Sequence, residues 1–243
     1  MFYISLRSGK FRIMYKKWQP GKNDIEKVLA QAKSLGAKTI LDVGGNRVFT
    51  LPGAVSAGWE GEIKVDLNCD TLPFGDKEVD FVYSRHTIED LAYPAHILRE
   101  MNRVGKAGYI ETPSIKAELT RGVDACGYHR GYAHHRWYVT PSDDTLVLIA
   151  KYPVTERYVG IDVGLDCLEW WTGLRDDEWN SQFFWQDTLK FVVREHESGL
   201  KVSEWDAHAP RSYLNFIIEA LIDQHFSVSE EFANRQASAS QRR

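Results

Sequence analysis

The spacing of hydrophobic residues predicts strands that alternate with helices in the first half of the chain. Apolar side chains recur at the spacing of one helical face between Asp24 and about Leu35, and Gly36 is a typical residue to end that helix. The same spacing predicts a second helix over residues 92–104. Short apolar runs predict strands at residues 38–43, 62–67, 79–84 and 107–113. This alternation favours β-α-β units around a parallel sheet.

The pattern changes beyond Thr140. Residues 144–154 and 182–196 have the composition and alternation of strands, and we expect them to form an antiparallel pair that completes the sheet. Residues 211–226 have the stripe of an amphipathic helix. A core helix is the simpler interpretation of that stripe, and a contact in a possible homodimer is the alternative. The chain ends in small and polar residues that predict a disordered tail.

Composition narrows the classes of function. A chain of 243 residues with 43% hydrophobic residues is expected to form one domain with a core. The net charge of −4 provides no basic field for nucleic acid. No apolar run approaches the roughly 18 residues of a membrane span, so no transmembrane segment is expected. The three cysteines form no metal-binding or CxxC spacing, which favours a reducing, cytoplasmic location.

The first predicted strand runs into a glycine turn, where candidate ligand chemistry begins. Gly44 and Gly45 follow Asp42 by two and three positions, and glycine lets a backbone approach a ligand closely. Asp66 lies 24 residues beyond Asp42 at the end of a predicted strand. An acidic residue about 20 residues past such a turn suits the two hydroxyls of a ribose. A simple tight turn without a ligand is the alternative.

Four further stretches occur in order: "LDVGGN", "VDL", "LPFGDKEVDFVYSRHTIEDL" and "LREMNRVGKAGYIETPS". Together they resemble the signature series of class I S-adenosylmethionine-dependent methyltransferases of the type-11 group, over about residues 37–115. The resemblance implies a Rossmann-like α/β fold with a mostly parallel seven-stranded sheet, one antiparallel strand and helices on both faces. It implies one domain over residues 1–243: a cofactor-binding core at about 20–115, an acceptor-side elaboration at 116–228 and a tail at 229–243.

The resemblance also implies S-adenosyl-L-methionine as the cofactor and a set of residues that bind it. These are Asp42, Gly44, Gly45, Asn46, Asp66, Asp70, Leu72, Ser84, Arg85 and His86. Whether Asp66 or Asp70 contacts the ribose stays open. The family's G-x-G-x-G pattern would place glycines where this chain has Asn46 and Val48. A catalytically degenerate binding or scaffold module is therefore the alternative, and a nicotinamide-dependent dehydrogenase is disfavoured.

A histidine-rich stretch, residues 126–139, follows the last predicted strand of the core and is expected to border the ligand crevice. His135 is the candidate general base, with His86 as its competitor, because imidazole titrates near neutral pH. Arg136 is expected to orient the acceptor, and Trp137 or Tyr138 to provide a stacking face. The histidine spacing gives no regular metal-binding pattern, and assistance by a divalent metal ion stays open as a minor alternative. A surface loop with ordinary hydrogen bonds is the alternative.

These features predict methylation of an oxygen of a small-molecule or glycan-type acceptor. An alcohol must lose its proton as it accepts the methyl group, which requires a base within hydrogen-bond reach. The tryptophan-rich stretch at 168–185 offers the flat apolar faces that sugars or aromatic acceptors require. Tryptophans that pack on the core are the alternative for this stretch.

Overall fold

The computed structural model describes residues 22–46, 50–118, 131–151 and 176–194. The chain divides into two compact units, Met1–Ser198 and Gly199–Arg243, and every described residue belongs to the first. The helix expected at 211–226 and the tail expected at 229–243 lie outside the described residues. No helix within the described ranges is both long and apolar enough to cross a membrane.

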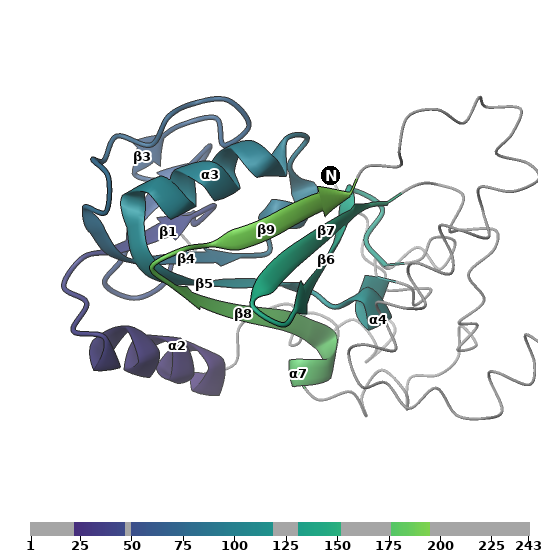
Figure 1. Ribbon diagram of the computed structural model, residues 1–243, viewed down its shortest axis with the longest axis horizontal. Helices are drawn as coiled ribbons and strands as arrows, with labels where there is room; N and C mark the ends of the chain where they lie inside the picture. Colours follow the sequence, from purple (N-terminus) through teal and green to yellow (C-terminus); the bar gives the residue numbers. More distant parts are fainter. Residues whose placement is uncertain (1–21, 47–49, 119–130, 152–175, 195–243) are drawn as a thin grey trace, which may run out of the picture. The chain divides into compact units, whose positions relative to one another are not determined.

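The main sheet has six strands among the described residues, in the order β3-β2-β1-β4-β5-β8 (Figure 1). They are β1 (Ile40–Val43), β2 (Val55–Gly58), β3 (Ile63–Lys64), β4 (Val79–Arg85), β5 (Gly105–Pro113) and β8 (Asn180–Gln186). The first five pair in parallel, and β8 pairs antiparallel with β5. The expectation of a mostly parallel sheet with an antiparallel strand is confirmed, with six strands described where the sequence analysis expects seven.

Strand β2 was not predicted from the sequence. Its residues, Val55-Ser56-Ala57-Gly58, are small and lack the run of β-branched side chains that indicates a strand. Glycine suits the last position because Gly58 has φ of 152°, whereas a Cβ there would make only an ordinary van der Waals contact with the Cα of Gly44, at 3.5 Å. The strand predicted at 62–67 is correspondingly reduced to the two residues of β3. Asp66 therefore follows the edge strand β3.

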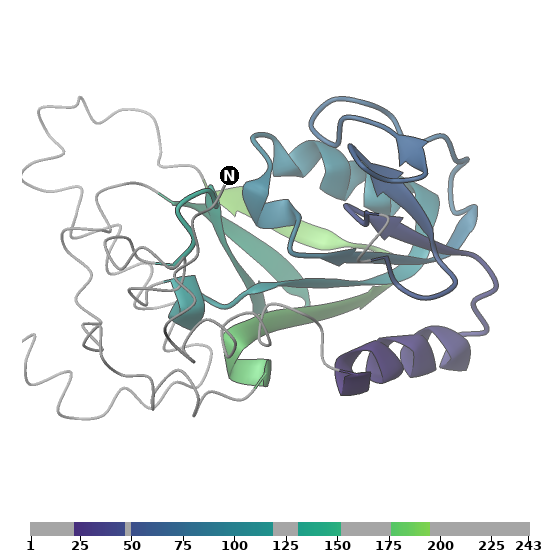
Figure 2. The same ribbon diagram turned by 180° about the vertical axis from the view of Figure 1, so that it is seen from behind.

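Two helices cover opposite faces of the main sheet, α2 (Lys22–Ser34) and α3 (Pro94–Val104) (Figures 1 and 2). Helix α3 buries the stripe Ile97, Leu98, Met101 and Val104 in one hydrophobic cluster. Helix α2 packs Val28 and Ala32 into a second cluster with Phe81, Tyr83 and Tyr109 of the sheet. Three shorter elements are η1 (Ile88–Asp90), α4 (Ile115–Glu118) and α7 (Asp176–Trp179).

A second sheet lies against the α3 face and has the order β6-β7-β9. Its strands are β6 (Trp137–Ser142), β7 (Thr145–Ala150) and β9 (Lys190–Arg194). Strand β7 pairs antiparallel with β6 and parallel with β9. Leu146 and Leu148 of β7 join the same core cluster as α3, so this sheet shields part of the main sheet from solvent.

The expected strand pair 144–154 and 182–196 is wrong in its partners. The second segment turns at Asp187, which has φ of 62°, so its first part forms β8 in the main sheet and its second part forms β9. The turn is fixed on both sides: the Asp187 N–H donates to the Lys106 carbonyl at 2.7 Å, and the Lys77 ammonium donates to the Asp187 carbonyl at 2.7 Å. Of these two parts, only β9 pairs with β7, in parallel and in the second sheet.

Candidate functional site

The carboxyl ends of β1, β4 and β5 lie at one edge of the main sheet because these strands are parallel. The antiparallel β8 begins at the same edge, where Asn180 pairs with Pro113. Ligands of open α/β sheets bind outside this edge. The glycine turn, the exit of β4 and the start of β8 therefore meet where a cofactor site is expected.

The glycine turn is shaped by the protein's own packing. Gly44 has φ of 91° and donates its N–H to the Ala57 carbonyl at 2.8 Å. A Cβ on Gly44 would lie 2.0 Å from the Thr87 Oγ1. A Cβ on Gly45 would lie 2.6 Å from the Asp42 Cγ. The need for glycine at these two positions thus comes from Thr87 and Asp42, whereas the sequence analysis expects close approach to a ligand.

Asp42 closes this turn from below. Its side chain is buried and accepts the Leu51 N–H at 2.7 Å. Burial raises the pKa of Asp42 to about 7, although hydrogen bonds from the backbone of Leu51 and Gly45 oppose the rise. Asp42 therefore holds the two ends of the turn together, which positions the backbone of Gly44 and Gly45 at the sheet edge.

Asp66 and Asp70 share one turn after β3. The Asp66 Oδ1 accepts two hydrogen bonds from Asn68, at 2.9 Å from its N–H and 3.0 Å from its Nδ2, and these bonds lower the pKa of Asp66. The Asp70 Oδ2 accepts the Asp66 N–H at 2.7 Å. Leu72 lies just beyond, with its side chain buried in the core. Asp70 thus supports the backbone from which Asp66 projects.

Ser84 and Arg85 at the end of β4 are committed to contacts within the protein. The Ser84 hydroxyl donates to the Val43 carbonyl at 2.9 Å and joins β4 to β1. The Arg85 Nε lies 2.7 Å from the Glu111 Oε1, and Asn180 donates to the same oxygen at 3.0 Å. Both residues lie at the expected edge, and these contacts fix its shape.

His86 follows directly, and its side chain is 9% exposed. Its backbone has the left-handed conformation, with φ of 49°. Its Nε2 lies 3.2 Å from the Asn180 Oδ1, and its Nδ1 lies 3.9 Å from the Glu89 Oε1. Burial lowers the pKa of His86 well below 6.5, and the positive charge of Arg85 lowers it further. His86 is therefore neutral at pH 7.

His135 lies at the start of β6 and reaches the same carboxyl edge. Its Nδ1 lies 2.5 Å from the Glu118 Oε1, and the Lys151 Nζ lies 2.5 Å from the Glu118 Oε2. Burial opposes ionisation of Glu118, yet the bonds from His135 and Lys151 lower its pKa. Burial likewise acts to lower the pKa of His135, but the bond and charge of Glu118 outweigh it and raise that pKa. The pair stays charged although it is buried.

The two candidate bases face one carboxylate. Glu89, in η1, lies 3.9 Å from the His86 Nδ1 and 4.0 Å from the His135 Nε2. Burial raises the pKa of Glu89 to about 8, against the opposing charge of His135. Glu118 contacts His135, and Asn180 contacts His86. Both belong to the candidate site, and sequence reasoning missed them. The "HTIED" stretch marked Glu89 only by its place after a histidine.

Arg136 and its neighbours complete the loop before β6. The Arg136 N–H donates to the Glu89 carbonyl at 2.7 Å, and its side chain is exposed. Trp137 donates from Nε1 to the Leu91 carbonyl at 2.7 Å and is buried, as is Tyr138. The expectation that Trp137 or Tyr138 stacks on an acceptor is therefore wrong, because both rings are used in packing. Cys126, His129 and Arg130 lie outside the described residues.

One family model matches part of this core. Residues 54–110 match the family model of the methyltransferase domain. No curated protein sequence matches the chain.

Three solved structures give weak overall likenesses. A methyltransferase dependent on S-adenosylmethionine from Aquifex aeolicus is 24% identical, covers 45% of this chain and 75% of its own, and has a TM-score of 0.30. A putative methyltransferase in complex with the Trm112 activator from Haloferax volcanii is 17% identical over 58% and 81%, with a TM-score of 0.31. A putative methyltransferase from Bacillus halodurans is 14% identical over 49% and 71%, also with a TM-score of 0.31. At these TM-scores the likenesses carry no argument about the site.

The family match spans strands β2 to β5 and the whole of α3, and the glycine turn precedes it at the edge where a cofactor binds. The match covers 57 of the 243 residues, all of them within the main sheet, its helix α3 and the turns between them. This part of the core is similar to the methyltransferase domain.

Proposed function

We propose that this chain is an S-adenosylmethionine-dependent methyltransferase that acts on an oxygen of a small-molecule or glycan-type acceptor, with His135 as the general base. The observation that carries the proposal is the buried Glu118–His135 pair at the carboxyl edge. A carboxylate that accepts the proton of one imidazole nitrogen leaves the lone pair on the other nitrogen. Methyl transfer to nitrogen or sulfur nucleophiles does not need a base held in this way to the same extent as transfer to an alcohol.

In this proposal some residues would bind the cofactor and others would remove the proton of the acceptor. The Gly44–Gly45 turn and Asp66 would hold S-adenosylmethionine, which supplies an activated methyl group when bound. His135 Nε2 would take the proton of the acceptor hydroxyl, and Glu118 would stabilise the imidazolium that forms. The second sheet covers one face of the core and helps to exclude water from this edge.

His86 has a different role in this proposal. Its Nε2 is held by Asn180, and the residue is buried and neutral. It would therefore hold the start of β8 against the end of β4 through Asn180, while His135 moves the proton. Arg136, exposed beside the Glu89 carbonyl, would orient an anionic group of the acceptor through its planar guanidinium.

The test is a screen of hydroxylated acceptors, including mono- and oligosaccharides and phenols, with S-adenosylmethionine. The readouts are S-adenosylhomocysteine released and the position of the new methyl group by mass spectrometry. A product methylated on oxygen, formed by wild-type protein and by the surface control Glu26→Gln but about 100-fold more slowly by His135→Ala, supports the proposal. A product methylated on nitrogen or sulfur contradicts it. Cofactor binding without turnover on any acceptor would favour a binding module.

A further inference from the structure

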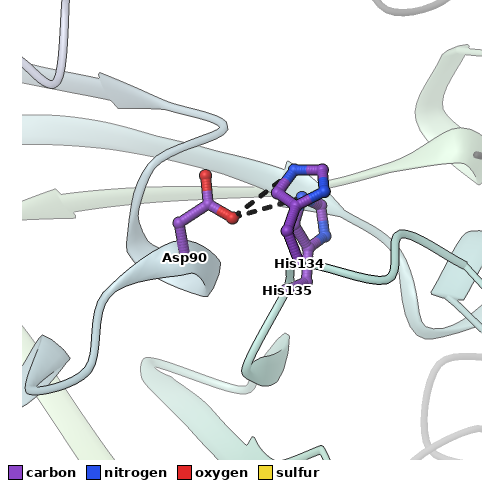
Figure 3. Close-up of side chains that lie close together, drawn as sticks. All are labelled: Asp90, His134 and His135. Carbon is purple, nitrogen blue, oxygen red and sulfur yellow. Dashed lines mark ion pairs between the residues drawn. The ribbon is translucent and has the colours of Figure 1, made fainter. Parts of the chain in front are cut away.

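A cluster of metal-ligating side chains lies beside the proposed base and was not predicted from the sequence. Asp90 ends η1, and His134 and His135 lie in the loop before β6 (Figure 3). The Asp90 Oδ1 is 3.6 Å from the Nε2 of His134 and 3.6 Å from the Nε2 of His135. One ligand atom from each residue lies within 4.8 Å of the others. In Figure 3 the two imidazole rings face the Asp90 carboxylate from the same side.

The protonation pattern of His135 suits a metal ligand. Its Nδ1 contacts the Glu118 carboxylate at 2.5 Å, so Nδ1 keeps its proton, and Nε2 is the nitrogen that provides a lone pair when a metal ion displaces the second proton of the imidazolium. The lone pair thus lies on the nitrogen nearer Asp90 and Glu89. A histidine that binds a metal typically donates its other N–H to a carboxylate, as His135 does here.

A contact at one ring nitrogen also orients His86. Its Nε2 contacts the Asn180 Oδ1, and the Asn180 amide is itself oriented because its Nδ2 donates to Glu111. The His86 proton therefore lies on Nε2, and its Nδ1 lone pair is the atom nearest Glu89. Two histidines thus have their lone-pair nitrogens nearest the same carboxylate.

Glu89 supplies independent evidence for a missing cation. Its side chain is 1% exposed, and neither carboxylate oxygen has a hydrogen-bond partner in the part of the chain that the structure describes. The buried His86 Nδ1 and Asp90 Oδ1 also lack one there. Polar atoms of three neighbouring residues, beside the Nε2 of His135, thus lie close together with no hydrogen bond to a described residue. Buried polar groups of native proteins are rarely left in this state.

We propose that Asp90, His134 and His135 bind a divalent transition-metal ion, with the carboxylate of Glu89 lying behind His135 on the buried side, 4.0 Å from its Nε2. Imidazole and carboxylate ligands together suit ions such as Zn²⁺, Co²⁺ and Mn²⁺. The Asp90 Oδ1 lies 3.6 Å from each histidine Nε2. Two ligand atoms of a tetrahedral site with metal–ligand bonds of about 2.1 Å are about 3.4 Å apart, which is close to this distance. The ion would retain a position for an oxygen of water or of an acceptor.

The metal site does not depend on the proposed acceptor chemistry. A bound ion would occupy the Nε2 lone pair of His135, so His135 cannot bind the ion and act as a base in the same molecule. An acceptor hydroxyl bound to the ion would then release its proton to solvent, because a divalent ion lowers the pKa of an oxygen bound to it. Metal binding is measured without cofactor or acceptor, which keeps the two proposals separable.

The experiment titrates the chelator-treated full chain with Zn²⁺ by calorimetry and with Co²⁺ by visible absorption. One ion per chain is expected, with d–d absorption bands from cobalt in a low-symmetry site of nitrogen and oxygen ligands. Asp90→Asn and His134→Gln alter side chains that are partly or largely exposed, so both variants should fold. Each should weaken binding at least tenfold, and Glu118→Gln should weaken it by about 10-fold to 100-fold, as loss of a contact that orients a ligand does.

His96→Gln is the matched control, because it removes a histidine that lies outside the cluster and should leave the affinity unchanged. Folding of every variant is checked by near-ultraviolet circular dichroism and thermal unfolding. Absence of one-to-one binding to the wild type overturns the proposal. So does binding that Asp90→Asn and His134→Gln leave intact, because the ion would then be held by other residues. Binding that follows the expected pattern supports the site even when no acceptor is found.

Discussion

The glycine turn and the histidine loop lie at the same edge of the main sheet, but their contacts span different lengths of chain. In the turn, Asp42 binds the backbone of Leu51 nine residues away, and Asp70 binds the backbone of Asp66 four residues away. In the histidine loop, the contact between His135 and Glu118 spans 17 residues, and that between His86 and Asn180 spans 94. The first region is shaped by local hydrogen bonds and the second by how the two sheets meet.

The match to the methyltransferase-domain model covers Asp66 and Asp70 of the first region and begins after the glycine turn. The match to the methyltransferase domain ends at residue 110, before Glu118, His135 and Asn180. Substitutions in the glycine turn should therefore act on cofactor binding. Substitutions in the histidine loop should act on turnover or metal binding with the cofactor site intact. The predictions below test this division.

The largest effect is expected for Gly44→Val. Its Cβ would lie 2.0 Å from the Thr87 Oγ1, and a β-branched residue would be strained at φ of 91°. The clash pushes the turn away from β4, so we expect loss of measurable S-adenosylhomocysteine binding and a fall in unfolding free energy of about 2–5 kcal/mol. Calorimetry and urea unfolding provide the two measurements.

Gly53→Ala is the matched control for backbone strain. Gly53 has φ of 80°, but its Cβ would meet nothing within 4 Å. We expect this variant to lose about 1–2 kcal/mol of stability and to retain cofactor affinity. Equal loss of affinity in the two variants would show that strain in this segment, and not the contact with Thr87, governs the cofactor turn.

The sequence predicted the first region well because its signals are local. Apolar spacing located α2, α3, β1, β4 and β5, and the ordered motifs indicated the cofactor class. Strand β2 was missed because its residues are small and lack the run of β-branched side chains that indicates a strand. Glu118 and Asn180 were missed because they become partners of the histidines only through the pairing of β8 with β5 and the packing of β6. The expected strand pair failed for the same reason, since the turn at Asp187 depends on Lys77 and Lys106.

Asp42→Asn should change the pH dependence of stability. The pKa of Asp42 is raised by burial from 3.8 to about 7, so the folded protein holds a proton that the unfolded chain releases in this range. The unfolding free energy of the wild type therefore falls as pH rises from about 4 to about 7, by at most about 4 kcal/mol from this group. Asparagine does not titrate, so this part of the slope should disappear.

Urea unfolding of both proteins across that pH range measures the difference. Asp80→Asn is the contrasting control: Lys106 and two backbone N–H groups lower the pKa of Asp80 below 3.8, so its contribution to stability is lost only as pH falls below about 4, and the slope between pH 4 and 7 should stay as in the wild type. A slope that is identical in the wild type and in Asp42→Asn would contradict a buried, protonated Asp42.

His135→Ala should lower turnover by about 100-fold or more and leave the affinity for S-adenosylhomocysteine unchanged. His135→Gln, whose amide can still donate to Glu118, should show the same loss and a smaller change in stability. His86→Ala should instead weaken cofactor binding as well, because it removes the contact with Asn180 at the end of β4. Comparable loss of cofactor affinity in the His135 and His86 variants would contradict the prediction that the histidine loop acts on turnover with the cofactor site intact.

The pH profile of turnover sharpens this test. Glu118 raises the pKa of His135, and the base must be unprotonated, so kcat should rise with pH through a value above the ordinary 6.5 of histidine. Glu118→Gln removes the negative partner and should move that rise to lower pH. A profile that keeps its position in Glu118→Gln would assign the base to another group.

The smallest effect is expected for Asp66→Ala, and it tests the cofactor region at its acidic turn. If Asp66 accepts the ribose hydroxyls, its loss should weaken S-adenosylhomocysteine binding by about 1.5–3 kcal/mol, or about 10-fold to 100-fold. Methylthioadenosine and its 2′,3′-dideoxy analogue separate this contact from a general change in the turn. Asp66→Ala should weaken binding of the first compound and leave the second unchanged. Asp70→Ala removes the acceptor of the Asp66 N–H and should weaken both compounds by a similar factor. Selective loss for the diol in Asp70→Ala, with none in Asp66→Ala, would transfer the ribose contact to Asp70.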